Sequence, residues 1–483
     1  PTWFDNKILM AQNEYRQSNE KSKFIADFGF VNGYKSSLSK KKNNLSHLFA
    51  NFDLNLDLKE FDSSKLTMSI EQVSNDTYLK IFDAHITKSI LRPDNFDILN
   101  NKLKLSLDHE RYNFEAGIES YEDLQLENND RYQYVLPYYN YSTILDNQFF
   151  NSTIGFKSSG SNNLNNTNDL KTNIINDISL NWQSYISNLG FLNSYSVDVK
   201  NLNSLGKKNS EYKSSPQIEF VSIFTANTSI PLIKEEKNYT NFLIPKASLK
   251  INPSDMKNYS TSEKKINVGN IFSNNRLGFE DTLESGKSLT LGVDYKRENN
   301  DLDKINNYFE VKLATVLRDK IEQHIPTTST LNKKNSNLFG SISNNFSDQF
   351  KLNYNFAIDN DLNKFEYNDF NATLSINNLV TTFNFIEENG VMGNTNAFEN
   401  SISYTFDENN YLSFKTRRNR KLNLTEYYDL VYEYKNDCLT AGIKYKKSYY
   451  QDRDLKPTEN LLFTLTLFPL TTYEYVADEL LEN

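Results

Sequence analysis

The sequence is short of cysteine and of long hydrophobic runs. Its 483 residues contain one Cys, two Trp and four His. Because Cys438 is alone, it cannot form a disulfide within the chain, and it is either a buried free thiol or one half of a bond to a residue outside this sequence. Since no run of about 18 or more apolar residues occurs, the sequence excludes a transmembrane helix.

Charge and histidine spacing exclude further classes of protein. The chain carries 53 Lys and Arg against 62 Asp and Glu, for a formal net charge of -9, and this mild acidic balance argues against a nucleic-acid partner. The four histidines lie far apart and none has metal-ligand spacing (His47, His85, His109 and His324). No nucleophile elbow, glycine-rich phosphate loop or paired-carboxylate signature stands out. We therefore predict that the protein is not an enzyme and has no catalytic residue, no metal and no cofactor.

What the sequence does contain is an alternation of apolar and polar residues with a period of two. In residues 48–58 the even positions are almost all apolar, and most odd positions are Asn or Asp. Successive side chains of a β-strand point to opposite faces, so this segment has one apolar and one polar face. The same alternation recurs along nearly the whole chain, at residues 103–107, 112–118, 178–182, 289–295, 350–358, 370–376, 439–445 and 461–467.

Composition indicates which kind of β protein these strands form. Only 38% of the residues are hydrophobic and the mean hydropathy is -0.65, whereas a soluble chain of this length normally contains several domains with more apolar cores. A transmembrane β-barrel needs only an outward apolar band about 25 Å tall around a polar interior. We therefore predict an all-β fold, a large antiparallel transmembrane β-barrel of roughly 24–26 strands, with no helical domain.

The aromatic residues and the connections favour the same fold. Thirty Tyr and 33 Phe cluster near strand ends, where aromatic girdles meet the membrane interfaces. The alternative is that they pack the core of a soluble β-sandwich. We expect one barrel over residues 1–476, followed by an acidic tail over 477–483. Short turns should alternate with long polar loops, which we expect at residues 158–169, 205–217, 252–265 and 297–307.

The densest basic cluster consists of Arg417, Arg418, Arg420 and Lys421. Its simplest interpretation is the charged end of a loop at the membrane rim. Arg also pairs with phosphate through two parallel hydrogen bonds, so the cluster is a candidate contact for the phosphates of an anionic glycolipid. The sequence leaves both interpretations open.

Three segments resemble one known family. Residues 270–286, which include Asp281 and Glu284, resemble the mid-barrel signature of the lipopolysaccharide-assembly family LptD. Residues 426–439 are similar to the C-terminal signature of that family in its alphaproteobacterial form, and residues 134–138 are similar to a third, weaker segment. With these segments, the resemblance extends over essentially the whole chain.

The resemblance implies a function, partners and a location. Members are outer-membrane barrels of Gram-negative bacteria that enclose the lipoprotein LptE as a plug and carry an N-terminal periplasmic jellyroll. Lipopolysaccharide passes from a periplasmic bridge of Lpt proteins through the jellyroll and leaves sideways into outer-membrane lipid. The jellyroll and most of strand one have no counterpart here, so we take this sequence to be part of a longer precursor, trimmed at its N-terminus.

The resemblance also implies a lateral gate between the first and last strands. Pro1 matches a family proline at the edge between strands one and two, and a proline lacks the N–H that a strand ladder needs. Unpaired backbone groups are costly in lipid, so a barrel can open only at one weak seam. We expect this seam between residues 8–16 and the last strand. The lipid-facing residues of that last strand are expected to be Leu461, Phe463, Leu465 and Leu467.

The cysteine has a counterpart in the same family. Cys438 matches the C-terminal cysteine position, where relatives often carry two adjacent cysteines, but here Asp437 precedes it. The resemblance therefore implies at most one disulfide to the missing N-terminal region.

Two rival interpretations stay open on the sequence. The first is another large outer-membrane barrel, either a general porin or a TonB-dependent transporter. The second is an interaction protein, either an Asn-rich adhesin or a soluble β-sandwich. Solubility without detergent would identify the second class at once.

Overall fold

The computed structural model describes residues 2–476 apart from 6–7, 35–42, 87–88, 127, 148–150, 167, 302–306, 348, 450–457 and 468–470. Most of the described residues lie in strands, and 27 strands form one sheet with antiparallel pairing. The chain divides into two compact units, which we call unit 1 (residues 1–182 and 198–221) and unit 2 (residues 183–197 and 222–483). No helix of the described chain is both long and apolar enough to cross a membrane.

Among the described residues, unit 1 holds the first ten strands, two short α-helices and one 3-10 helix, η1. They are β1 (Thr2–Asp5), β2 (Ile8–Ser18), β3 (Ser22–Tyr34), β4 (Asn43–Asn55), β5 (Ser63–Val73), α1 (Tyr78–Ile81), α2 (Asp83–Ile86), β6 (Ile98–His109), β7 (Tyr112–Asp123), η1 (Asn128–Arg131), β8 (Tyr132–Asn147), β9 (Ser152–Asn165) and β10 (Asp169–Trp182). The residues of β12 (Leu192–Lys207) and β13 (Gln217–Ser229) are divided between the two units.

Unit 2 holds the remaining strands. They are β11 (Tyr185–Ile186), β14 (Leu232–Glu235), β15 (Tyr239–Asn252), β16 (Gly286–Asn299), β17 (Tyr308–Arg318), β18 (Leu338–Ser347), β19 (Phe350–Ile358), β20 (Phe365–Ile376), β21 (Leu379–Glu388), β22 (Asn396–Thr405), β23 (Asn410–Asn419), β24 (Leu424–Lys435), β25 (Leu439–Ser448), β26 (Thr458–Leu467) and β27 (Thr471–Val476), with the 3-10 turn η3 (Thr327–Ser329).

The predicted number of strands is confirmed. Among the described strands, β11 has only two residues, and β14 continues the line of β13 because both pair with β15. The interruption falls at Pro231, which has no N–H to donate to the ladder. Setting these two short pieces aside leaves 27 − 2 = 25 strands, within the expected range.

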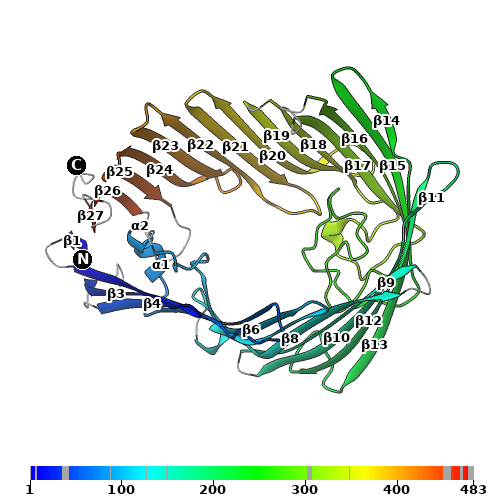
Figure 1. The fold of residues 1–483 in the computed structure, drawn as a ribbon, viewed down its shortest axis with the longest axis horizontal. Coiled ribbons are helices and arrows are strands. Elements are labelled where there is room, and N and C mark those ends of the chain that lie inside the picture. The colour runs from blue at the N-terminus through cyan, green and yellow to red at the C-terminus, as the bar shows by residue number, and fades with distance from the viewer. Residues whose placement is uncertain are drawn as a thin grey trace. The chain divides into compact units, whose positions relative to one another are not determined.

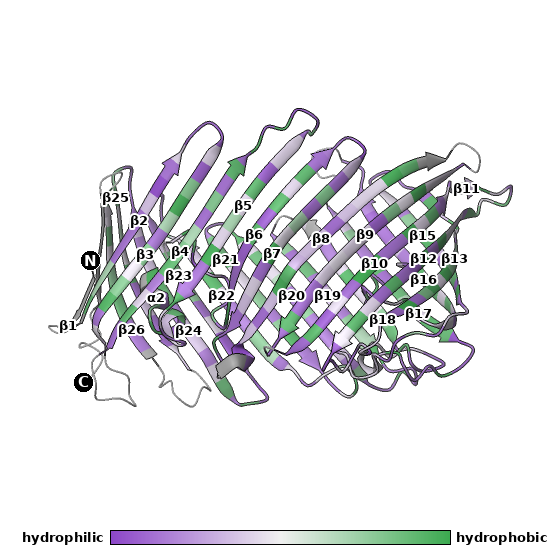
Figure 2. Cartoon of the chain, turned by 90° about the horizontal axis from the view of Figure 1, so that it is seen from below, coloured by the Kyte–Doolittle hydropathy of each residue, from purple (hydrophilic) through white to green (hydrophobic). Residues whose placement is uncertain are grey.

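Hydrophobic and hydrophilic residues alternate along the strands (Figure 2). Because successive side chains of a strand point to opposite faces, this alternation gives the sheet two distinct faces. On β19 and β20 the apolar pair Tyr354 and Phe370 lies on one face, and the polar pair Asn355 and Asp369 lies on the other. On the apolar face, side chains such as Ile402 remain 44% exposed within the protein. Exposed aliphatic side chains in regular rows are typical of a surface that contacts lipid. The all-β prediction is therefore confirmed.

One predicted loop is wrong. Residues 158–169 were expected to be irregular because they are rich in Asn and Ser, but β9 runs through Asn165 and pairs with β10 along its whole length. Polar side chains bond across this ladder, as in the 2.8 Å hydrogen bond from Ser158 Oγ to Asn176 Oδ1. Cross-strand hydrogen bonds of this kind stabilise a sheet without any apolar side chain. The other three expected loops begin or end a few residues from the prediction, and that at 252–265 is part of a longer connection, 253–285.

The connections in unit 2 differ between the two ends of its strands. At one end, which we call the long-loop end, they span residues 253–285, 319–337, 359–364, 389–395 and 420–423. At the other end, which we call the short-turn end, they include residues 300–307, 377–378, 406–409 and 436–438.

Unit 1 carries its two helices on the polar face of the sheet. Figure 1 shows α1 and α2 lying against the concave side of β3 and β4. Tyr78 and Phe82 pack there onto Val31, Leu45 and Phe49, all of which are buried. Apolar residues at these positions interrupt the polar face because the helices cover them.

Candidate functional site

The most extensive structure on the inner face of unit 2 is the connection between β15 and β16, residues 253–285, which we call the inner segment (Figure 1, where it lies inside the green and yellow strands). Its buried residues Ile271 and Phe279 belong to an apolar cluster with Val316 of β17 and Phe339 of β18. The same cluster includes Ile325 of the connection 319–337. The inner segment is therefore a packed element and not a free loop.

A buried ionic cluster, which we call the clamp, fastens the inner segment to the sheet. Glu284 receives two hydrogen bonds from Arg276, at 2.7 Å from Nε and 2.5 Å from Nη2, and a further one from Arg318 at the end of β17. Arg276 also donates to the hydroxyls of Ser288 and Thr290 on β16, each at 2.9 Å. One carboxylate thus faces two guanidinium groups, an arrangement in which paired geometry offsets the cost of burying charge.

The electrostatics of the clamp follow from burial and charge. Burial alone would raise the pKa of Glu284, but the nearby charges of Arg276 and Arg318 lower it to about 2. All three side chains are at most 7% exposed. At neutral pH the clamp therefore contains one ionised carboxylate held by two cations.

The clamp explains the mid-barrel signature recognised in the sequence. Gly286 has a φ of +82°, and a Cβ there would lie 2.4 Å from Oε1 of Glu322, so only glycine fits. Asp281 accepts a hydrogen bond from the Tyr259 hydroxyl at 2.6 Å, and the side chain of Asn275 bonds both backbone polar groups of Phe279. The sequence marked these residues only by resemblance, and their packing role was missed.

Unit 1 has a second buried polar network that the sequence did not reveal. His47 Nδ1 and the Tyr78 hydroxyl are 2.7 Å apart, and His47 Nε2 lies 3.4 Å from Asp27. Gln12 donates to Asp27 at 2.9 Å, and Asp27, His47 and Tyr78 are all buried. Burial raises the pKa of the Tyr78 phenol on α1 well above its usual range. Among the described residues no group of three or more His, Cys, Asp or Glu could hold a metal ion.

The predicted basic cluster lies at the long-loop end of β23 and β24. Arg417 forms a 2.9 Å ion pair with Glu426, Arg418 bonds Asn423 at 2.5 Å, and Lys421 bonds the Asn394 carbonyl at 2.7 Å. The strand register shifts between Arg417 and Arg418, and this β-bulge changes the direction in which these side chains point. All four residues of the cluster, including Arg420, are exposed.

The predicted gate residues lie on β26. Phe463, Leu465 and Leu467 are 36%, 39% and 41% exposed, and they share one face with the half-buried Leu461. This strand is not the last, as the sequence had suggested, because β27 follows and pairs with it. The proline expected at the other side of the gate, Pro1, lies outside the described residues.

Cys438 lies at the short-turn end of unit 2. It is an exposed free thiol in the turn 436–438 between β24 and β25, where its backbone N–H donates to Asn436 Oδ1 at 3.0 Å. The sequence left two states open for Cys438, a buried free thiol or one half of a bond to a residue outside this sequence, and its exposed position excludes the buried thiol. The basic cluster and Cys438 thus occupy opposite ends of the same strands.

These features define a class of protein. Antiparallel strands with one apolar and one polar face, and with packed elements on the polar face, form a large β-barrel of the outer-membrane type. The family model described as LptD, LPS transport system D, matches residues 47–409, and the chain belongs to this family. The match covers the mid-barrel signature, whereas the C-terminal signature at 426–439 lies beyond it. The LptD family is a transport family, and membership implies lipopolysaccharide as substrate and the outer membrane as location.

Other comparisons add little. No curated protein matches the chain. Among solved structures, a mutant ferric enterobactin receptor PfeA of Pseudomonas aeruginosa has a TM-score of 0.31 at 9% identity, covering 95% of this chain and 73% of that chain. The ferric-catecholate import receptor Fiu of E. coli K12 has a TM-score of 0.35 at 9% identity, covering 97% and 79%. The siderophore receptor PirA of Acinetobacter baumannii has a TM-score of 0.31 at 8% identity, covering 93% and 74%. Likenesses this low carry no argument.

Proposed function

We propose that the protein inserts lipopolysaccharide into the outer leaflet of the outer membrane through a lateral gate between the first and last strands of the barrel. The observation that carries the proposal is that the sheet has one apolar and one polar face, in a chain that belongs to a lipopolysaccharide-transport family. The polar face suits the sugars and phosphates, and the acyl chains travel along the apolar face. The energy for transport is supplied elsewhere in the pathway.

The orientation of the barrel follows from its connections. Outer-membrane barrels have short periplasmic turns and longer outer loops, so the long-loop end of unit 2 faces outward. This orientation puts Arg417, Arg418, Arg420 and Lys421 at the level of the outer leaflet, where they contact lipopolysaccharide phosphates. The same orientation puts Cys438 in the periplasm, where it can pair with a cysteine upstream of Pro1.

The gate is proposed at the terminal strands. The register between β1 and β2 shifts between Trp3 and Asp5. An irregular register gives fewer ladder hydrogen bonds, so this edge separates at lower cost than the regular central pairings. Leu461, Phe463, Leu465 and Leu467 form the lipid face of β26 beside the exit, and Pro1 weakens the opposite edge.

Partners follow from the same proposal. An LptE-like lipoprotein occupies the lumen as a plug, and periplasmic Lpt bridge proteins deliver lipopolysaccharide through an N-terminal jellyroll. The alternative is another large outer-membrane barrel, a porin or a TonB-dependent transporter, and no observation on this chain favours it.

A disulfide across the gate tests the proposal in cells that express the full-length protein. Because β1 pairs with residues 8–10 of β2, the seam expected at residues 8–16 lies instead at β1. Cysteine pairs between residues 2–5 of β1 and 471–476 of β27 should halt the surface display of lipopolysaccharide, and reductant should restore it. The matched control joins Asn353→Cys on β19 to Asn371→Cys on β20, which face each other within the wall, and should leave display unchanged. Normal surface display in locked cells would overturn the lateral-gate assignment.

A further inference from the structure

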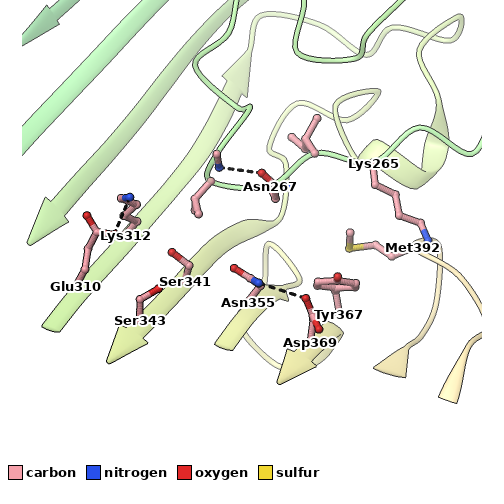
Figure 3. Close-up of a pocket in the computed structure, with 13 residues that line it drawn as sticks. Lys265, Asn267, Glu310, Lys312, Ser341, Ser343, Asn355, Tyr367, Asp369 and Met392 are labelled. Carbon is pink, nitrogen blue, oxygen red and sulfur yellow. Dashed lines mark hydrogen bonds and ion pairs between the residues drawn. The ribbon is translucent and has the colours of Figure 1, made fainter. Parts of the chain in front are cut away.

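A polar cavity lies between the inner segment and the wall of unit 2. It measures about 320 Å³ and is lined by alternate residues on the polar face of β17–β20, together with residues 265–269 of the inner segment (Figure 3). Its size is at the lower end of the range for small-molecule sites, roughly 300–1,000 Å³. Because the clamp and the apolar cluster hold the inner segment in place, the cavity is a preformed feature of the wall.

The charges in the cavity neutralise each other. Lys312 pairs with Glu310 at 2.8 Å, and Lys265 pairs with Glu388 at 2.6 Å. A further carboxylate, Asp369, accepts a hydrogen bond from Asn355 at 3.2 Å. Both cations are thus engaged by carboxylates, and an entering anion would also meet Asp369. This arrangement disfavours phosphate and favours a neutral ligand.

The remaining lining consists of hydroxyls and amides, the glycine Gly269, and four less polar side chains, which are Ile266, Val268, Tyr367 and Met392. Figure 3 shows Ser341, Ser343 and Asn355 along neighbouring strands, with Tyr367 and Met392 at one side. Tyr367 packs against the apolar cluster of unit 2, which fixes its ring. Polar groups that both donate and accept hydrogen bonds suit the hydroxyls around the rim of a sugar ring. The fixed aromatic ring beside them suits the C–H groups on the faces of that sugar ring.

We propose that this cavity binds a neutral sugar unit of the oligosaccharide of lipopolysaccharide, and so is a way station on the lumenal wall. The assignment rests on the proposed function for its substrate class, and adds which part of the substrate the wall recognises and where. The cavity recognises the neutral hydroxyls of the sugar and not a phosphate group of the substrate. This preference distinguishes it from the exposed cluster Arg417–Lys421.

The test is direct binding to the purified full-length protein in detergent. The probe is the core oligosaccharide released by mild acid and dephosphorylated, titrated by calorimetry, with inorganic phosphate as a second probe. Ser343→Trp fills the cavity and Asn355→Leu removes an amide, so each should raise the Kd for the oligosaccharide at least tenfold. The matched control is Asn371→Leu, which lies on the polar face of β20 outside the cavity and should change the Kd less than twofold. Circular dichroism confirms that each variant is folded.

Three results would overturn the assignment. They are unchanged affinity in both cavity variants, absence of binding at millimolar oligosaccharide, and displacement of the oligosaccharide by inorganic phosphate. The gate experiment reports separately on the proposed function. If locking the gate stops lipopolysaccharide delivery but the oligosaccharide does not bind, only the cavity assignment is wrong. If the oligosaccharide binds but locking the gate has no effect, only the proposed translocation route is wrong.

Discussion

Removing the charge of Glu284 should loosen the inner segment while leaving the sheet intact. In the clamp this carboxylate is the common partner of Arg276 and Arg318, and all three side chains are buried. Glu284→Gln keeps the shape of the side chain but leaves two guanidinium groups without a counter-charge. Breaking a buried ion pair by removing one partner typically costs about 3–5 kcal/mol. The expected result is local opening of residues 270–285.

The pKa of Glu284 gives a second, independent magnitude for the free energy that the ionised carboxylate contributes to folding. A fall from the ordinary value of 4.5 to about 2 corresponds to about 3 kcal/mol of stabilisation of the ionised, folded form. A carboxyl whose pKa is lowered by folding stabilises the fold above its unfolded pKa. That contribution is therefore complete above about pH 4.5 and is lost as the pH falls toward about 2.

Hydrogen exchange followed by mass spectrometry measures this opening. At neutral pH, Glu284→Gln should lower the protection of amides in residues 270–285 on the order of 100-fold, because each 1.36 kcal/mol is about tenfold. The pH dependence below 4.5 should also disappear in the variant. The control is Glu236→Gln, which removes an exposed pair with Lys234 and should change nothing. Protection within threefold of the parent would refute the clamp as the anchor of the inner segment.

Further predictions concern packing, redox state and phosphate contact. Gly340→Val should destabilise the barrel by about 1–3 kcal/mol, because a Cβ there would lie 2.2 Å from the ring of Phe356. The thermal midpoint of heat-modified gel migration measures this loss of stability, and adding Phe356→Ala should restore part of it. In full-length protein, Cys438→Ser should change mobility on a non-reducing gel, whereas unchanged mobility would favour an unpaired thiol. Arg417→Gln with Arg418→Gln should lower co-purifying lipopolysaccharide severalfold, and equal loss with dephosphorylated lipopolysaccharide would contradict a phosphate contact.

The strands could be predicted from the sequence because their pattern is local. Along 350–376 each side chain alternates between faces, so the apolar set and the polar set are defined before any partner strand is known. The same reasoning failed at 158–169, where a polar strand and a polar loop have the same composition. The difference is decided by the neighbouring strand, whose Asn side chains bond to the Ser side chains of β9.

The candidate site was only partly visible in the sequence. Resemblance marked residues 270–286, but nothing local indicates that Arg318 should meet Glu284 across the connection. Nor does anything local indicate that Tyr78 on a helix should reach His47 on β4, which lies beside Asp27 on β3. The sequence by itself determined an all-β wall with one apolar and one polar face, since a period of two is a property of neighbouring residues. Only the tertiary structure decided which polar residues become buried, because burial depends on which distant segment folds back onto the wall and covers them.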